Sequence, residues 1–225
     1  MQQRIERTPA HLHVEFDQPR RALSSAIYNG GLVYATHVVN LKVEKNSDAP
    51  DQVFEPPDTT LATYCRSRGW RGVAVGLMTA ASMNSGRKVR RVERGVEVTA
   101  LVTAGLSNAR RAGDRAEWRR FSEPEPTLGT INIIILTSAR LTDAAMVETM
   151  LVLTEAKAAV LQECGAKSRA SPTVATGTGT DAAVVVSGWG PPEVRFCGKH
   201  VLFGEMVASV TMEALQASLA GGSSL

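Results

Sequence analysis

The feature that most constrains the fold is the run from Ile131 to Leu136, in which five of six residues are Ile or Leu. A run of this kind, rich in β-branched side chains, predicts a β-strand that is buried on both faces. Two further apolar runs, Gly72 to Met78 and Val96 to Val102, also predict buried strands. Ala182 to Val186 predicts another strand near the end of the chain. The core is therefore expected to form around a β-sheet.

Three segments predict helices. Thr142-Asp143 is expected to cap the longest one, Ala144 to Cys164, and Gly165 to close it. Apolar residues cover most of the circumference of this helix, so we expect it to be largely buried. A shorter helix should start near Asp58 and end before Gly69, and the last should extend from Gly204 to Leu219.

Early in the chain, strands are expected at 11–16, 22–27 and 32–43, with a hairpin turn at Asn29-Gly30-Gly31 between the last two. The chain order of strands and helices predicts an α/β or α+β fold: a single domain with a mixed β-sheet flanked by helices. We expect one domain over residues 1–220 and a flexible tail over 221–225. Residues 46–57 predict a loop, and residues 110–126 a charged surface excursion.

Composition excludes several classes of protein. The chain has 225 residues, a net charge of +3, and three cysteines without a C-x-x-C pair, which argues against a disulfide framework and a zinc ribbon. It contains no signal-like N-terminus and no apolar run of membrane-spanning length, so we expect a cytoplasmic protein without a membrane partner. Acidic residues interrupt the two arginine-rich segments and aromatic residues are sparse at 5%, so nucleic acid is not an expected partner. A homodimer is the default expectation.

Small polar segments stand at the ends of the predicted strands and helices, where a rigid fold presents ligand-binding groups. They are Asn29-Gly30-Gly31, T-A-G-L-S-N-A from Thr103, G-T-I-N from Gly129, T-E-A-K from Thr154, A-T-G-T-G-T-D from Ala175 and G-K-H from Gly198.

In this order, the six segments resemble the adenosylcobinamide amidohydrolase family. The resemblance implies a hydrolase with a corrinoid substrate, which removes the aminopropanol arm of adenosylcobinamide and yields adenosylcobyric acid for cobalamin salvage. Residues 201–203 are more apolar than the family pattern. The alternative function is a corrinoid- or nucleotide-binding protein without catalytic activity.

Four residues are candidate catalytic groups. His200 is the candidate general acid or base, because the ordinary pKa of histidine lies near neutrality, and Lys199 stands beside it. Asp181 is a candidate to orient His200 or a water molecule. Glu155 lies on the apolar helix, two residues before Lys157, so these side chains point about 200° apart and cannot share a face. At least one of the two should be partly buried. The alternatives are a surface Lys199, a capping His200 and a solvated helix face.

Candidate substrate-binding groups carry amides, hydroxyls, small residues or charge. They are Asn29, Gly30, Gly31, Thr103, Asn108, Asp114, Asn132, Lys157, Thr176, Thr178 and Thr180. The asparagines suit the amide-rich rim of a corrin ring, but asparagine is also a common turn former. Asp114 can instead close a loop, and Asp181 can instead stabilise its own turn.

The segment Gly177-x-Gly179-x-x-Ala182 matches a dinucleotide-binding fingerprint in its residue types but not in its predicted secondary structure. That motif needs a helix after it, whereas a strand is predicted here, so we interpret the segment as a turn that lines a pocket. No local metal-ligand spacing is evident, and a metal site would require His37, Asp114, Asp181 and His200 to converge. No cofactor is required by the sequence, and metal dependence stays open. We interpret His37 as a satisfied core histidine and Cys197 as an inert buried thiol.

Overall fold

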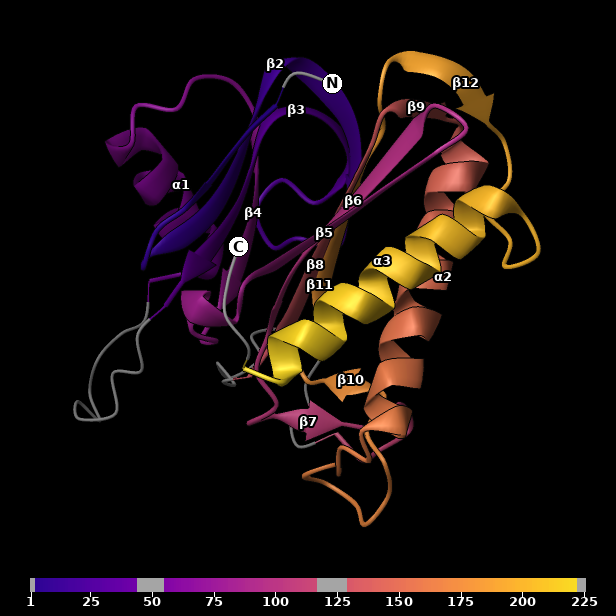
Figure 1. Cartoon of the computed structure of the whole chain (residues 1–225). Coiled ribbons are helices and arrows are strands. Elements are labelled where there is room, and N and C mark those ends of the chain that lie inside the picture. The colour runs from indigo at the N-terminus through magenta and orange to yellow at the C-terminus, as the bar shows by residue number, and fades with distance from the viewer. Residues whose placement is uncertain (1–2, 44–54, 117–128, 222–225) are drawn as a thin grey trace.

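The structure is a computed structural model that describes residues 3–43, 55–116 and 129–221. A large mixed sheet carries helices on its outer faces (Figure 1). Its elements are β1 (Gln3–Arg7), β2 (His11–Ser24), β3 (Gly31–Lys42), α1 (Pro57–Ser67), β4 (Ala74–Thr79), a 3₁₀ turn (Met83–Ser85), β5 (Arg87–Glu93), β6 (Val96–Ala104), β7 (Ala109–Arg110), β8 (Ile131–Thr137), β9 (Ala139–Leu141), α2 (Asp143–Glu163), β10 (Gly177–Thr178), β11 (Ala182–Val186), β12 (Gly190–Val194) and α3 (Leu202–Leu219).

The main sheet has the order β4-β3-β2-β11-β8-β6-β5, and β1 adds to β2 at the side. Strands β3 and β4 run parallel, as do β8 and β11, and the other pairs in this sheet are antiparallel. The β2–β3 register shifts between Glu15 and Arg20. Figure 1 shows both strands arching there, so the sheet curls over and its two halves face each other.

The curled sheet separates three apolar cores. Inside the curl, Leu12 and Val38 pack with Leu101 and Ile134 from the other half of the sheet. On the outer face of β6 and β8, a larger core forms against α2 and α3. A third, smaller core lies between α1 and strands β3 and β4. All seven residues of β8 are buried because one face of this strand meets the inner core and the other meets the helices.

The predicted fold class is confirmed, as are the buried strands and the long helix. The Thr142 hydroxyl caps α2 by accepting a hydrogen bond from the Ala145 N–H at 3.2 Å, and Gly165 follows with a φ of 64°. The predicted hairpin at Asn29-Gly30-Gly31 is confirmed, since β2 and β3 pair antiparallel and Asn29 has a φ of 52°. The predicted end of the first strand was wrong: β2 ends at Ser24, and residues 25–30 form the connection. The Ser24 hydroxyl accepts from Ala26 N–H at 2.7 Å, which turns the chain early.

Strands β1 and β5 were not predicted, because both are mostly charged sequences at sheet edges. Several predictions lie wholly or partly outside the described residues: most of the loop at 46–57, the excursion beyond residue 116, and the tail at 222–225. Among the described helices, none combines the length and apolarity needed to cross a lipid bilayer.

Candidate functional site

Four of the six small polar segments meet at one end of the main sheet. Thr103 on β6 pairs with Asn132 on β8, and Asn132 pairs with Ala182 on β11. Strand β10 pairs with β7, so that Thr178 lies opposite Ala109. Helix α2 contributes Lys157 to the same end. We call the polar group formed here the Asp181 cluster; its members are Asn108, Thr130, Lys157, Thr178, Thr180 and Asp181.

The Asp181 carboxylate is the centre of this cluster. Lys157 Nζ lies 2.5 Å from Oδ2, and the side chains of Lys157 and Asp181 are only 12% and 13% exposed. The backbone N–H of Thr178 donates to Oδ2 at 2.9 Å, and that of Ile131 donates to Oδ1 at 3.0 Å. The Thr178 hydroxyl also donates to Oδ1. A largely buried ion pair requires this kind of compensation, and these bonds tie α2, β8 and β10 together.

Two glycines flank Thr178 and make room for polar side chains. A Cβ atom on Gly177 would lie 2.4 Å from Asp181 Oδ2 and 3.0 Å from Lys157 Nζ. On Gly179, a Cβ atom would lie 2.4 Å from Asn108 Nδ2. The glycines of this Thr-Gly-Thr-Gly-Thr segment therefore serve close approach. Strand β11 follows directly, which confirms that the segment is not a dinucleotide-binding turn.

The segment G-T-I-N packs against the other side of the cluster. The hydroxyls of Thr130 and Thr180 lie 2.6 Å apart, and Thr180 donates to the Gly129 carbonyl at 3.0 Å. Thr130 is therefore the donor to Thr180. Gly129 has a φ of +112°, and a Cβ atom there would lie 2.5 Å from Asn108 N. Glycine is needed at this position both for its backbone angle and for space.

A chain of buried amides extends from the cluster into the curl of the sheet. Asn132 Nδ2 donates to Asn40 Oδ1 and to the Met78 carbonyl, both at 2.8 Å, and Asn40 Nδ2 donates to the Thr103 hydroxyl at 2.8 Å. Two buried atoms, Asn108 Nδ2 and Asn132 Oδ1, have no hydrogen-bond partner among the described residues. Unpaired buried polar atoms are costly, and in proteins such atoms usually have an ordered water molecule or another polar group as a partner.

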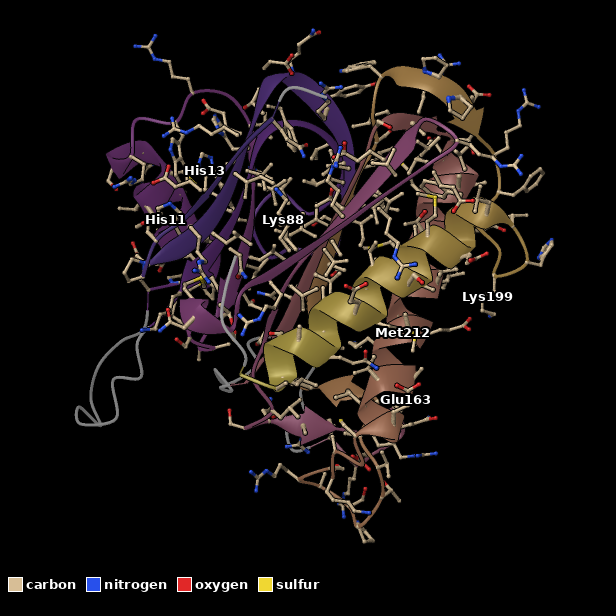
Figure 2. The ribbon with its side chains drawn as sticks, viewed as in Figure 1. His11, His13, Lys88, Glu163, Lys199 and Met212 are labelled. Carbon is tan, nitrogen blue, oxygen red and sulfur yellow. The ribbon has the colours of Figure 1, made fainter. Side chains whose placement is uncertain are left out.

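The structure places the other catalytic candidates elsewhere. Lys199 Nζ lies 2.5 Å from Glu155 Oε2, and these side chains are 65% and 58% exposed. Figure 2 shows Lys199 on the outer side of α2 and α3. The prediction that Glu155 and Lys157 occupy different faces of the helix, with at least one partly buried, is confirmed. His200 is exposed, and the hydrogen bonds found for Asp181 go to Lys157, Thr178 and Ile131.

Asp114 and Thr176 hold a loop beside the cluster. Asp114 Oδ2 accepts from Arg111 N–H at 2.8 Å and from the Ser168 hydroxyl at 2.5 Å. Hydrogen bonds from Ser168 and Ser171 lower the pKa of Asp114. The Thr176 hydroxyl accepts from Ala112 N–H at 2.8 Å. Both side chains therefore fasten residues 110–114 to the segment that leads into β10.

The turn at Asn29 has contacts of its own. Asn29 has a φ of 52° and Gly31 a φ of 86°, and Asn29 Nδ2 donates to the Ala74 carbonyl on β4 at 2.8 Å. An added Cβ atom on Gly30 would lie 2.2 Å from the Ala26 carbonyl oxygen. The contacts found for this turn thus go to β4 and to its own loop.

The two remaining interpretations are confirmed. His37 is buried, and its Nε2 donates to the Arg71 carbonyl at 2.9 Å. Burial raises the pKa of the Cys197 thiol to about 11, so it stays protonated at neutral pH.

Two polar features were not predicted from the sequence. One is Asn40, which lies within a predicted strand. The other is His11-x-His13, whose spacing in a strand puts both histidines on one face.

Known proteins from two organisms are similar to this chain in sequence. An adenosylcobinamide amidohydrolase of Methanosarcina mazei is 28% identical over 200 residues, which cover 85% of this chain and 86% of that protein. An uncharacterised protein of Methanocaldococcus jannaschii is 38% identical over 132 residues, covering 52% of this chain and 51% of that protein. This chain therefore spans about half the length of that second relative.

Among solved structures, a protein of Pyrococcus horikoshii matches with a TM-score of 0.47 and 12% identity, covering 97% of this chain and 79% of that chain. Similarity at this level carries no information about function. A model of the adenosylcobinamide amidohydrolase family matches residues 1–224. Because this match spans nearly the whole sequence, the chain belongs to the adenosylcobinamide amidohydrolase family.

Proposed function

We propose that the chain hydrolyses the amide bond between the aminopropanol arm and the corrin ring of adenosylcobinamide, giving adenosylcobyric acid and aminopropanol. Membership of the family supports this reaction, as does the name of the Methanosarcina mazei relative. The single observation that carries the proposal is the Asp181 cluster. It collects residues from four of the family-like segments around one largely buried lysine–carboxylate pair.

Amide hydrolysis needs an attacking group, donors for the oxygen that becomes negatively charged, and a proton for the leaving amine. Thr178 is the proposed attacking group, because its hydroxyl donates directly to a carboxylate, that of Asp181. Lys157 is a cation at the same carboxylate, and the unpaired Nδ2 of Asn108 is a second donor beside Gly179. Thr178 thus has one donor side chain next to each of its flanking glycines.

The proposed reaction has two steps. Thr178 Oγ1 forms a bond to the amide carbon while its proton passes to Asp181. The C–N bond breaks, and the aminopropanol nitrogen leaves with a proton from Lys157. Water then hydrolyses the ester, which releases the carboxylic acid and restores the threonine hydroxyl. The proton that Asp181 took from Thr178 passes to Lys157 through their hydrogen bond, so both side chains return to their starting charges. Asp181 has a second task, since its Oδ2 atom holds Lys157 in place.

The competing assignment uses His200, Lys199 and Glu155. These three residues are exposed, and the Lys199–Glu155 pair lies on the opposite side of α2 from Lys157. Exposed ion pairs contribute little and are screened by salt. We therefore assign the reaction to the Asp181 cluster and expect the exposed group to be dispensable for it.

The proposal is tested by incubating the purified protein with adenosylcobinamide and separating the products by mass spectrometry. The expected result is release of aminopropanol and adenosylcobyric acid in equal amounts. Running the reaction in ¹⁸O-labelled water should place one labelled oxygen in the new carboxylate. Corrinoid binding without release of either product would overturn the enzyme assignment and leave a corrinoid-binding protein.

A further inference from the structure

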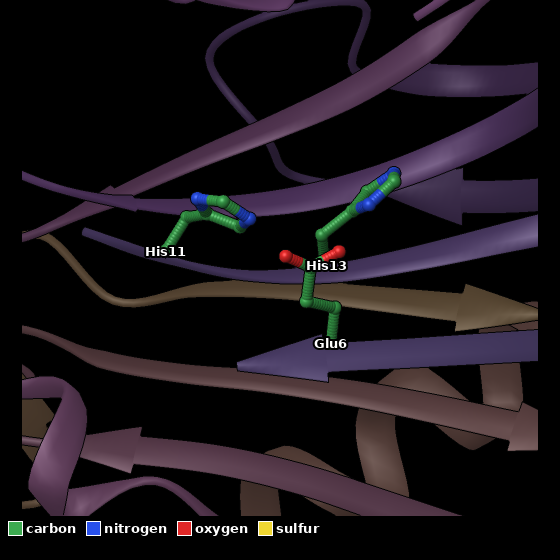
Figure 3. Close-up of side chains that lie close together, drawn as sticks. All are labelled: Glu6, His11 and His13. Carbon is green, nitrogen blue, oxygen red and sulfur yellow. The ribbon is translucent and has the colours of Figure 1, made fainter. Parts of the chain in front are cut away.

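A second polar cluster lies on β1 and β2, away from the Asp181 cluster. Glu6 pairs with His13 in the antiparallel register of these strands, and His11 is two residues before His13, so all three side chains share one face of the sheet. One possible ligand atom from each of them lies within 4.8 Å of the other two. Figure 3 shows the Glu6 carboxylate rising from β1 toward the rings of His11 and His13.

His11 supplies an unpaired nitrogen to this cluster. The residue is 1% exposed, and its Nε2 atom has no hydrogen-bond partner among the described residues. Its other ring nitrogen, Nδ1, lies 2.7 Å from the Tyr64 hydroxyl and 3.1 Å from the Thr8 hydroxyl. Nδ1 can therefore carry the ring proton and leave Nε2 with a free lone pair. A buried nitrogen in this state requires a partner to offset its lost hydration.

A chain of hydrogen bonds fixes the tautomer of His13. The Arg71 carbonyl is an acceptor only, so His37 Nε2 carries a proton and donates to it at 2.9 Å. In a neutral ring, His37 Nδ1 is then an acceptor, and it lies 3.1 Å from His13 Nε2. His13 therefore donates from Nε2 and keeps the lone pair on Nδ1. Metal-binding histidines are typically oriented in this way by a bond from their other nitrogen.

The surroundings shield both rings from water. His11 is 1% exposed and His13 is 4% exposed. Trp70 stacks on the His13 ring, with the two ring centroids 3.7 Å apart, and covers it. An ion bound to these nitrogens would therefore be protected from solvent.

We propose that Glu6, His11 and His13 form a binding site for a divalent transition-metal ion, with Zn²⁺ the best match to the ligands. Two imidazoles and one carboxylate are ligands that zinc accepts. Neighbouring ligand atoms around tetrahedral zinc lie roughly 3.3 Å apart, because each bond is about 2.0–2.1 Å long. The partly exposed Glu6 side chain, on the edge strand β1, has the freedom to close the site to this spacing.

The burial of the two histidines assigns this ion a structural task. Both rings are shielded from solvent, so a large substrate has no access to them. Figure 2 shows His11 and His13 on the α1 side of the molecule, opposite to Lys199. An ion bound here would stabilise the pairing of β1 with β2, because it would have ligands from both strands. This inference does not depend on the proposed hydrolytic activity.

The test is isothermal titration of chelator-treated, folded protein with Zn²⁺, together with the visible d–d spectrum of the Co²⁺-loaded protein. We expect one equivalent of Zn²⁺ to bind and the melting temperature to rise with it. Glu6→Gln keeps the shape of a partly exposed side chain and should weaken binding strongly, and His11→Gln should abolish it. His37→Gln should weaken binding by about 10- to 100-fold, because His37 orients His13.

His200→Gln is the matched control, because it removes the one histidine outside this region and should leave one equivalent of Zn²⁺ bound. Circular dichroism checks that each variant is folded. Absence of Zn²⁺ binding to the folded wild-type protein would overturn the inference. So would wild-type affinity in folded Glu6→Gln, or loss of the site in His200→Gln. Each result is independent of corrinoid turnover, so failure here is distinguishable from failure of the proposed function.

Discussion

The hydroxyl of Thr178 is bound to Asp181 and stands between two glycines whose missing side chains leave space for Lys157 and Asn108. We predict that Thr178→Val lowers kcat on adenosylcobinamide by about 10²- to 10⁴-fold, because the attacking hydroxyl is lost. Thr178→Ser keeps a hydroxyl at the same atom and should retain measurable turnover. Equal activity of the valine variant and the wild-type protein would remove Thr178 from the mechanism.

Gly179 follows Thr178 and packs against the side chain of Asn108. An added methyl group would come within 2.4 Å of Asn108 Nδ2, so Gly179→Ala must displace the amide or the turn. We predict a lower kcat/KM for this variant. Gly113→Ala is the matched control, because a Cβ atom there meets no atom of the described residues within 4 Å, and the cost of this substitution comes from the φ of +96° at Gly113. If the Gly179→Ala variant were as active as the wild-type protein, the close contact between Asn108 and the Gly179 backbone would not be needed for the reaction.

His13 links pH to stability. Its pKa in the folded chain is lowered from the ordinary 6.5 to about 3. Between these two pH values, His13 is protonated in the unfolded chain but neutral in the folded chain. The stability contributed by neutral His13 is therefore complete above about pH 6.5 and declines as the pH falls toward about 3. Urea unfolding of metal-free protein at neutral and mildly acidic pH should show this decline, and His13→Gln should flatten it. If the unfolding free energy of His13→Gln depended on pH as strongly as that of the wild-type protein, His13 would not be the source of the decline.

The sequence alone indicates which side chains are candidate functional groups. It does not predict which of these side chains lie close together. The opposite directions of Glu155 and Lys157 follow from helix geometry alone. The contact between Lys157 and the Asp181 carboxylate depends on how α2 packs against β10. No local sequence pattern encodes this packing. His200 remained a candidate because its chemistry suits the reaction, but the chain places it on the surface.

Helix α2 connects the core to the site, since it buries Val152 and Leu153 and also carries Lys157. Its first turn depends on the Thr142 hydroxyl, which accepts the Ala145 N–H. Thr142→Ala should lower the free energy of unfolding by about 0.5–2 kcal/mol, measured by urea titration. Thr142→Ser keeps the cap and should lie close to the wild-type value. A loss of equal size in both variants would show that the hydroxyl is not the stabilising group.

Most elements were predictable because they are buried and periodic. The strands β6 and β8 and the helix α2 follow from runs of apolar residues, and the end of α2 follows from Gly165. Strand β5 has mostly exposed, charged residues, so its pairing with β6 depends on a neighbour and not on its own pattern. The same holds for β1, which pairs with β2.

The curl of the sheet was the largest feature that the sequence did not predict. Two separate strands were predicted at 11–16 and 22–27, on either side of Pro19, whereas the chain forms one strand, β2, with a register shift between Glu15 and Arg20. Proline is compatible with a strand at such an irregularity. The bend brings Asn40 to Thr103, although β3 and β6 are not neighbours in the sheet. This long-range closure builds the amide chain beside the Asp181 cluster.

We propose that the Asp181 cluster, rather than the exposed Glu155–Lys199 pair, performs amide hydrolysis. Helix α2 offers a direct comparison, because Lys157 and Glu155 lie two residues apart on opposite faces. The decisive measurement is kcat/KM on adenosylcobinamide for Lys157→Met and Glu155→Gln, side by side, in protein shown to be folded. We predict a fall of about 10²- to 10⁴-fold for Lys157→Met and near wild-type turnover for Glu155→Gln. Retained activity in Lys157→Met together with its loss in Glu155→Gln would contradict the claim.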